Sequence, residues 1–528
     1  MKTLRKRDIV IIGSGASGGA VMWSLAKNNY DVLCLEQGDW VDPATYATNS
    51  KDWQFLQKTK WSVSPNIRKL PVDYQINEEN SEISVLMYNA VGGSTIHWTA
   101  HAPRFHPSDF RVKTLDGVAD DWPITYFDLE KYYDLNDIMM GCSGINGDPA
   151  NPPRTPRPMK PLPLGKDGEL LAKAFDKLGW HWWPSDSYIN SENYNNRSAC
   201  NNCGPTALNC SRGARASTDI TYIPQAQKLG AELRTNCTVN SVIIDDTGRA
   251  KGVNYFDLNG NEYFQPANAV ILACNGIGTP RILLNSKPGG LANSSGLVGK
   301  NLMFHPYAGV QGVFPNLNNK AYMGPLANII MSQEFYETNS KNEFKRGYSF
   351  QINRSNGPAL TAINYTRWGE NHHKDFDNRF GNILGLGIIG DDLPEKINCV
   401  EIDNKITDKF GIPSVKVNYR LSENSKKLLA HGVKSAKKLL KSAGATEIFE
   451  TSHLKEAGWH LMGTTKMGNN SKSSVVNKYG QTHDIDNLFI VDGSVFVTAG
   501  AVNPIPTIQA FALWSSQYII NNRQDLKS

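Results

Sequence analysis

A run of closely spaced glycines near the N-terminus has the residue types and spacing of a phosphate-binding turn. Gly13, Gly15 and Gly18 form the pattern G-x-G-x-x-G, and Ser17 lies within it. The first glycine permits a tight turn, the second lets a pyrophosphate approach the backbone, and the third lets the next helix pack closely on the strand. The N-terminus of that helix stabilises phosphate charge. The pattern predicts a dinucleotide-binding site.

An acidic residue supports the same interpretation. Glu36 closes the next apolar run, where a carboxylate would accept hydrogen bonds from the ribose hydroxyls of a dinucleotide. The glycine turn and the acid do not distinguish FAD from NAD(P). At this point an NAD(P)-dependent dehydrogenase remains an alternative.

The elements that must position these residues follow from the hydrophobic pattern. Residues 8–12 form an apolar, β-branched run typical of a buried parallel strand. We expect a turn at 13–19, a helix at 20–27, strands at 31–35, 239–245, 269–273 and within 345–366, and a helix at 422–443. In that last helix one face is apolar and the other is rich in lysine, and Gly444 is suited to end it. The alternation predicts an α/β fold.

Composition sets limits on the class of protein. The chain has 528 residues, too many for one hydrophobic core, so we expect two closely packed domains. Its net charge of +5 gives no reason to expect nucleic-acid binding. No apolar run is long enough for a membrane helix, and the N-terminal residues lack the pattern of a signal peptide. We therefore expect a cytoplasmic chain, exported only with a partner that carries a signal.

Four further segments carry a resemblance to a known family. They are NAVGGSTIHW at 89–98 with DDWP at 120–123, ACNGIGTPRILL at 273–284, HLMGTTKMG at 460–468, and the stretch from VDGS at 491–494 to Asn503-Pro504. Their order and separation resemble the glucose–methanol–choline (GMC) oxidoreductases, which bind FAD. The His-Trp pair at 97–98 and the Asp-Trp-Pro segment resemble the branch of gluconate, sorbitol and glucose dehydrogenases, sugar 3-oxidising enzymes and pyranose oxidases.

The resemblance implies a fold and its domains. It implies an α/β (α+β overall) fold, with a Rossmann-like FAD-binding domain and an interleaved substrate-binding domain built on an antiparallel sheet. We assign residues 1–45, 80–145, 220–300 and 455–528 to the FAD-binding domain. Residues 46–79, 146–219 and 301–454 then form the substrate-binding domain and its excursions.

The resemblance also implies which residues form the site. It places His460 as the catalytic base and Asn503 as the second active-site residue, which orients the substrate oxygen. A neutral histidine suits the base because its pKa lies near neutrality, so we expect the reaction rate to rise with pH through the ordinary histidine range. Beyond Gly13, Gly15, Ser17, Gly18 and Glu36, the implied cofactor contacts are Gly92, Gly93, Ser94, His97, Val239, Asp492, Gly493, Asn503 and Pro504. His305 is interpreted as structural.

Two features leave alternatives open. In pyranose oxidases the histidine at the position of His97 is bound covalently to the flavin, whereas related dehydrogenases hold FAD dissociably. Cys200, Cys203 and Cys210 lie in a region where some relatives hold an iron–sulfur cluster, but their spacing departs from the ligand pattern associated with those enzymes. We therefore favour free or paired thiols and no metal.

These observations define an expected activity. We expect FAD-dependent oxidation of an alcohol group of a sugar, glycoside or polyol, by hydride transfer from carbon to flavin N5. The alternatives are a non-sugar primary or secondary alcohol as the substrate, an NAD(P)-dependent dehydrogenase, and a non-catalytic flavin-binding subunit. The electron acceptor is left open among oxygen, a quinone and a redox partner, and so is assembly with a small partner subunit or as a homo-oligomer.

Overall fold

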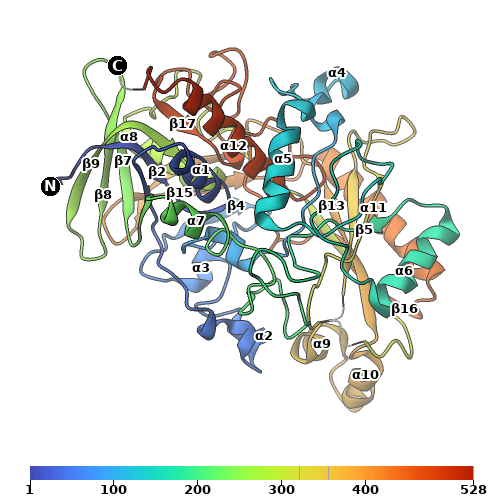
Figure 1. Cartoon of the computed structure of the whole chain (residues 1–528). Coiled ribbons are helices and arrows are strands. Elements are labelled where there is room, and N and C mark those ends of the chain that lie inside the picture. Colours follow the sequence, from blue (N-terminus) through green and yellow to red (C-terminus); the bar gives the residue numbers. More distant parts are fainter. Residues whose placement is uncertain (320–321, 355, 527–528) are drawn as a thin grey trace.

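A computed structural model of the chain describes residues 1–319, 322–354 and 356–526. Two large sheets dominate it, one on each side of the molecule in Figure 1. The largest cluster of buried hydrophobic residues, which includes Ile11, Val270, Phe350 and Leu386, runs from one sheet to the other, and smaller clusters lie beside it. The predicted mixed α/β fold is confirmed. The exact domain boundaries stay a prediction.

The first sheet carries the glycine turn. Its strand order is β6-β3-β2-β9-β8-β7, and β1 and β17 also pair with β9. The strands are β1 (Lys2–Thr3), β2 (Arg7–Ile12), β3 (Val32–Leu35), β6 (Glu232–Arg234), β7 (Thr238–Ile244), β8 (Ala250–Phe256), β9 (Glu262–Leu272) and β17 (Leu488–Ile490). β6, β3, β2, β9 and β17 pair in parallel, while β7, β8 and β9 form an antiparallel meander. The strands predicted at 8–12, 31–35, 239–245 and 269–273 all lie in this sheet.

Helix α1 (Ala16–Lys27) begins four residues earlier than the sequence pattern predicts. Glycine disfavours helix interiors, which is why 16–19 was expected to be turn. Packing overrides this preference. A Cβ atom on Gly18 would lie 1.9 Å from the carbonyl oxygen of Gly13, and one on Gly19 would lie 2.9 Å from Cβ of Thr218. The two glycines therefore let α1 begin soon after the end of β2 and pack closely against its neighbours.

The second sheet is antiparallel, in the order β16-β10-β13-β12-β11-β5. Its strands are β5 (Trp183–Pro184), β10 (Tyr307–Val313), β11 (Ile330–Phe335), β12 (Tyr348–Asn353), β13 (Ile383–Gly390) and β16 (Glu447–Thr451). Helix α11 (Glu423–Ser442) packs on β10 and β13 with its apolar stripe, in which Leu429, Val433, Ala436 and Leu440 are all buried. This helix was predicted within one residue at each end, and the side chain of Ser422 caps it.

The strand pattern expected within 345–366 is only half right. β12 occupies its first part, but Pro358–Tyr365 forms helix α9. Pro358 stands in the first turn of that helix, where its missing N–H is harmless. Thr361 is the only residue buried in α9, so the helix shows no apolar stripe that its sequence could reveal.

A third, smaller sheet and the remaining helices connect the two large sheets. The small sheet has the order β14-β15-β4, in which β4 pairs in parallel with β15. These strands are β4 (Ile76–Ser81), β14 (Cys399–Thr407) and β15 (Pro413–Tyr419). The other helices are α2 (Trp53–Leu56), α3 (Pro65–Arg68), α4 (Val112–Asp116), α5 (Tyr126–Met140), α6 (Gly165–Leu178), α7 (Tyr222–Lys228), α8 (Asn275–Ser286), α10 (His372–Arg379) and α12 (Ile505–Asn521).

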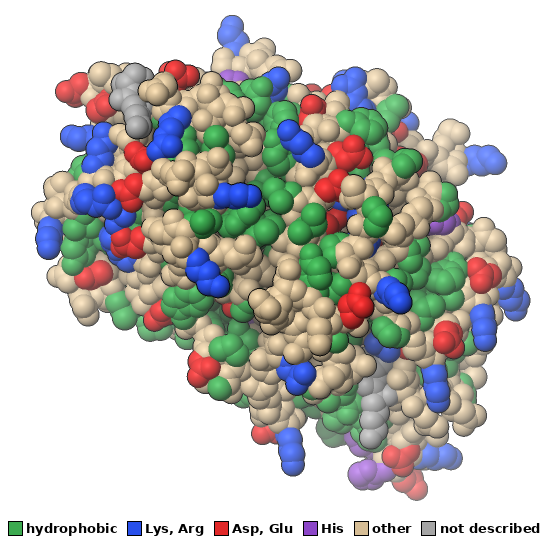
Figure 2. Space-filling view, in the orientation of Figure 1, with side chains coloured by type: hydrophobic (Ala, Val, Ile, Leu, Met, Phe, Trp, Pro, Cys, Tyr) green, Lys and Arg blue, Asp and Glu red, His purple; other side chains and the backbone are tan. Residues whose placement is uncertain are grey.

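The surface mixes both signs of charge. In Figure 2, lysine and arginine side chains alternate with aspartate and glutamate over the face shown, and neither sign forms a continuous field. Of the helices that the structure describes, none is long and apolar enough to cross a membrane.

Candidate active site

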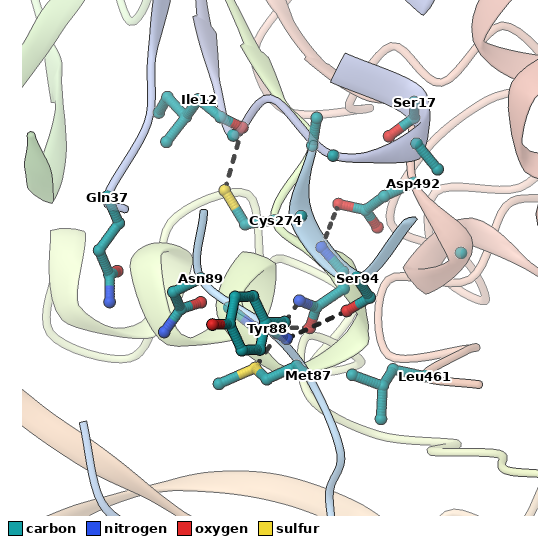
Figure 3. A pocket seen from close by; sticks show the side chains of 18 of the residues that line it. Ile12, Ser17, Gln37, Met87, Tyr88, Asn89, Ser94, Cys274, Leu461 and Asp492 are labelled. Carbon is teal, nitrogen blue, oxygen red and sulfur yellow. Dashed lines mark hydrogen bonds between the residues drawn. The ribbon is translucent and has the colours of Figure 1, made fainter. Parts of the chain in front are cut away.

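The first cavity lies where the parallel strands of the first sheet end. It is enclosed by the end of β2, the start of α1, the segment around Tyr88, and the loop at Asp492 (Figure 3). The predicted cofactor residues that line it are Gly13, Gly15, Ser17, Glu36, Gly93, Ser94, Val239, Asp492, Gly493 and Pro504. The chain therefore brings together, around one space, residues from both of its ends and from its middle.

Two of the glycines predicted to contact the cofactor do not line this cavity and have structural roles next to it. Neither Gly18 nor Gly92 borders the cavity. Gly18 permits the close packing of α1 described above. Gly92 has a φ of +92°, and a Cβ atom there would lie 3.1 Å from Oδ1 of Asp219. Its place is in the turn that delivers Gly93 and Ser94 to the cavity.

Glu36 ties the glycine turn to the end of β3. Its Oε2 accepts hydrogen bonds from the backbone N–H and the hydroxyl of Ser14, both at 2.8 Å, and its Oε1 accepts from the N–H of Gly38 at 2.9 Å. Burial raises the pKa of this carboxyl, while these donors oppose the rise. Because carboxylate oxygens have further lone pairs, Glu36 can still accept from a hydroxyl in the cavity.

The first cavity fits an anionic dinucleotide. The backbones of Gly15 and Gly93 pack against each other in its wall, where a Cβ atom on Gly93 would lie 2.9 Å from Cα of Gly15, and neither residue projects a side chain into the space. Two long helices, α1 and α12, begin at its wall, and neither has a side-chain cap or an acidic residue in its first turn. Uncapped helix N-termini present free N–H groups and partial positive charge. The pair of glycines leaves room for the ligand, and the two helix ends favour its negative groups.

Asp492 holds the far wall in place. Its Oδ2 accepts from the N–H of Asn275 at 3.0 Å and from the hydroxyl of Thr279 at 2.6 Å, and its Oδ1 accepts from the N–H of Ser494 at 2.9 Å. It thus joins the start of α8 to the turn that begins at Gly493. The carboxylate of Asp492 thus ties two segments of the cavity wall to each other.

A second cavity adjoins the first and reaches the antiparallel sheet. Most of its lining is apolar or aromatic, including Trp61, Leu86, Trp98, Tyr307 and Leu454. The residues that border both cavities are Met87, Tyr88, Ser94, Trp459, His460 and Ile505. The predicted base His460 therefore stands at the junction of the two spaces, and the predicted partner Asn503 lines the second.

A second histidine supports His460. Nδ1 of His305 lies 2.6 Å from Nδ1 of His460, and Nε2 of His305 lies 2.6 Å from the carbonyl oxygen of Gly500. A carbonyl only accepts, so Nε2 of His305 carries a proton and its Nδ1, in a neutral ring, accepts the Nδ1–H of His460. This assignment from the hydrogen-bond network leaves Nε2 of His460 with a free lone pair.

Both rings remain neutral. Burial lowers the pKa of His305 to about 4, against the opposing effect of the Gly500 carbonyl. Burial also lowers the pKa of His460 well below its ordinary value, and the nearby rings of His305 and His101 lower it further. A neutral imidazole with an exposed lone pair is the form that can accept a proton.

The amide of Asn503 is oriented by Gln351 of β12. Nε2 of Gln351 donates to Oδ1 of Asn503, and both side chains are buried. The amide nitrogen of Asn503 therefore remains to donate to a ligand in the second cavity. A neutral imidazole that can accept a proton and an amide that can donate a hydrogen bond thus line the same cavity.

His97 lines the second cavity and is absent from the lining of the first. Its Nε2 lies 3.4 Å from Nδ2 of Asn209, and its Nδ1 has no hydrogen-bond partner among the described residues. Burial lowers its pKa well below the ordinary value. Its position beside Tyr88, with 4.2 Å between ring centroids, places it close to the shared wall. Covalent attachment to a flavin stays a prediction.

The three clustered cysteines form no metal site in the part of the chain that the structure describes. No group of three or more histidine, cysteine, aspartate or glutamate side chains is arranged there to hold a metal ion. Cys203 is exposed, and Cys200 and Cys210 are partly buried free thiols. Sγ of Cys210 accepts from the N–H of Arg215 at 3.5 Å. An iron–sulfur cluster at these cysteines stays an untested alternative.

Sequence reasoning missed the partners of the two predicted catalytic residues. His305 was interpreted as structural, and Gln351 and His101 were not considered. His305 and His460 are 155 positions apart, and Gln351 and Asn503 are 152 positions apart. No sequence motif links residues at such separations. β12 alternates apolar and polar residues, so Gln351 carries no local signal that sets it apart from Ser349 or Asn353.

The fold and the first cavity are those of a dinucleotide-binding protein, and the second cavity adjoins the dinucleotide site. Two family models match the chain, one over residues 158–307 and one over residues 394–512, and both describe a GMC oxidoreductase. The chain belongs to the GMC oxidoreductase family. It is an FAD-dependent enzyme that acts on alcohol CH–OH groups, as its sequence predicts.

Individual relatives agree with this assignment. The chain is 40% identical over 536 residues to 2-methyl-1,2-propanediol dehydrogenase of Mycolicibacterium austroafricanum, covering 98% of this chain and 96% of that one. It is 28% identical to the fructose dehydrogenase large subunit of Gluconobacter japonicus, with 98% of each chain covered. A formate oxidase of Aspergillus oryzae has the same fold, with a TM-score of 0.66, 16% identity and 99% of each chain covered.

Proposed function

We propose that the chain oxidises a hydroxyl-bearing carbon of a small, weakly polar alcohol or diol. In this proposal Nε2 of His460 accepts the hydroxyl proton and the amide nitrogen of Asn503 donates to the same oxygen. FAD, when bound, supplies the two-electron acceptor for the hydride that leaves the carbon. The observation that carries the proposal is the His305–His460 pair, which holds an unprotonated Nε2 at the junction of the two cavities.

The lining of the second cavity supports a weakly polar substrate. A sugar carries a hydroxyl on nearly every carbon, and each would need a partner in a buried site. Leu86 and Leu454 provide none, and the indole N–H of Trp98 is already bonded to the carbonyl of Ala216. The 40% identical relative is named for a branched diol with four carbons, which suits such walls. These observations favour the non-sugar alternative over the sugar predicted from the sequence.

A sugar or polyol is the second candidate. The fructose dehydrogenase large subunit and the paromamine 6'-oxidase of Streptomyces fradiae, each 28% identical, support it. The electron acceptor is proposed as oxygen, a quinone or a redox partner, since the names of the relatives include both oxidases and dehydrogenases.

The test is reduction of FAD by a panel of alcohols under nitrogen. The panel contains 2-methyl-1,2-propanediol, 1-propanol, fructose and gluconate, and rapid mixing follows the flavin absorbance. We expect the diol to reduce the flavin fastest, and His460→Ala to slow this by roughly 10²–10⁴-fold while FAD stays bound. Reoxidation with air, a quinone or a dye then identifies the acceptor class.

Two results would contradict the proposal. Faster reduction by fructose or gluconate than by the diol would favour the sugar candidate. Near wild-type reduction by His460→Ala would remove His460 from the role of base. A matched variant is His453→Ala, since that histidine is partly buried, lies only seven positions away and lines neither cavity. It should reduce at the wild-type rate.

A further inference from the structure

His101 is a buried histidine in the second cavity to which the proposed chemistry assigns no role. The side chain lines the cavity together with His460 and Asn503, and the residue is only 1% exposed. It is close enough to His460 to lower the pKa of that ring. Its backbone is fixed by an antiparallel bridge to Ser187.

One ring nitrogen of His101 is anchored and the other is unpartnered. Nδ1 lies 3.1 Å from Oγ of Ser185, next to the edge strand β5. Nε2 is buried and has no hydrogen-bond partner among the residues that the structure describes. A buried polar atom without a partner costs free energy, so a ligand that satisfies it gains affinity.

The hydrogen-bond network assigns the proton. The hydroxyl of Ser185 donates to the carbonyl oxygen of Asp186, at 3.2 Å. A hydroxyl has one proton to give, so Oγ of Ser185 accepts the Nδ1–H of His101. In the neutral ring Nε2 then carries a lone pair and must accept. Burial lowers the pKa of His101 to about 3, which keeps the ring neutral throughout the physiological pH range.

We propose that Nε2 of His101 accepts a hydrogen bond from a second hydroxyl of the substrate, next to the carbon that is oxidised. This inference rests on the proposed function, because it takes the first hydroxyl to lie between His460 and Asn503. It makes His101 a specificity residue that selects diols over monoalcohols of the same shape.

Two other polar side chains of the cavity are less suited to this role. Gln351 is committed to orienting Asn503, to which its amide nitrogen donates. Nδ1 of His97 also lacks a partner, but Nε2 of that ring faces the donor Nδ2 of Asn209, so Nδ1 carries the proton and would donate. A hydroxyl proton needs an acceptor, and His101 offers one.

The test compares two alcohols that differ by a single hydroxyl. 2-Methyl-1,2-propanediol and 2-methyl-1-propanol have the same carbon skeleton and the same oxidisable primary alcohol. The dissociation constant and limiting rate of flavin reduction are measured for both, with the wild type, His101→Leu and His101→Gln. Leucine removes the acceptor, while the amide oxygen of glutamine replaces it near the position of Nε2.

We expect His101→Leu to weaken binding of the diol about tenfold, the scale of one hydrogen bond in a buried site, and to leave the monoalcohol within about twofold. His101→Gln should restore most of the preference for the diol. Bound FAD and the melting temperature serve as controls for folding.

The outcomes separate the two proposals. Equal losses for both alcohols in His101→Leu, or an unchanged preference for the diol, would overturn the role of His101 while the proposed function stands. If neither alcohol reduces the wild-type flavin, the proposed substrate class fails and this inference fails with it.

Discussion

The Nδ1 atoms of His305 and His460 lie 2.6 Å apart, so a single proton lies between the two rings. Because the other nitrogen of His305 faces the carbonyl of Gly500, this proton belongs to His460. The free lone pair on Nε2 of His460 thus depends on three hydrogen-bonded groups: the carbonyl of Gly500, His305 and His460 itself.

Removal of His305 should slow the reaction without removing the base. In His305→Ala the Nδ1–H of His460 loses its acceptor, and the ring can adopt the wrong tautomer or orientation. We expect flavin reduction to slow by about tenfold or more, which is less than the loss expected for His460→Ala. Asparagine places an acceptor near the position of Nδ1, so His305→Asn should retain more activity than His305→Ala. Equal rates in wild type and both variants would show that the pair has no influence on the base.

The pH profile should be flatter than an ordinary histidine would produce. The sequence alone predicts a rise in rate through the ordinary histidine range. In the structure burial lowers the pKa of His460 well below 6.5, so the neutral form persists as pH falls and is lost only when pH reaches the lowered pKa. We expect a constant rate of flavin reduction above pH 6.5 and a decline only well below it. A midpoint at or above 6.5, measured by rapid mixing, would contradict the burial described for this ring.

Asn503 and Gln351 should act as a unit. Asn503→Ala removes the donor to the substrate oxygen, and we expect a loss of roughly ten- to a hundredfold in the rate of reduction. Gln351→Leu leaves the donor present but no longer fixes the amide, so its loss should be smaller. In the double variant the losses should be less than multiplicative, because Gln351 acts through Asn503. Fully multiplicative losses would indicate independent roles.

Gly15 should control cofactor binding and leave the fold intact. A Cβ atom at Gly15 meets only Cα of Gly93, at 4.0 Å, so a larger side chain extends into the cavity and does not clash with the core. Gly15→Val should therefore abolish bound FAD, while Gly15→Ala should retain part of it. Absorbance of FAD per chain and circular dichroism check this. FAD bound by the valine variant at wild-type affinity would refute the placement of the cofactor in the first cavity.

The sequence predicted those helices and strands whose own residues show a clear hydrophobic pattern. Strands β2 and β3 are continuous apolar runs and helix α11 has a periodic apolar stripe, so each of these elements could be predicted from its own residues. α9 could not, because a helix with little buried surface shows no period. The start of α1 was misplaced because Gly18 and Gly19 are poor helix formers that close packing requires.

The candidate site divides in the same way. His460 and Asn503 lie in segments that resemble those of a known family, and both line the second cavity. Their partners His305 and Gln351 depend on contacts between residues more than 150 positions apart. Such contacts arise only when the two sheets pack together, and no spacing in the sequence encodes them.

The wall that the two cavities share limits how the substrate specificity of this enzyme can evolve. Met87, Trp459 and His460 border both spaces, so a substitution there alters the environment of the cofactor as well as that of the substrate. Ala308, Ile352 and Gly387 border only the second cavity, on strands of the antiparallel sheet. New substrates can therefore be acquired by mutation on that sheet alone, and an engineer who seeks a different alcohol should diversify it first.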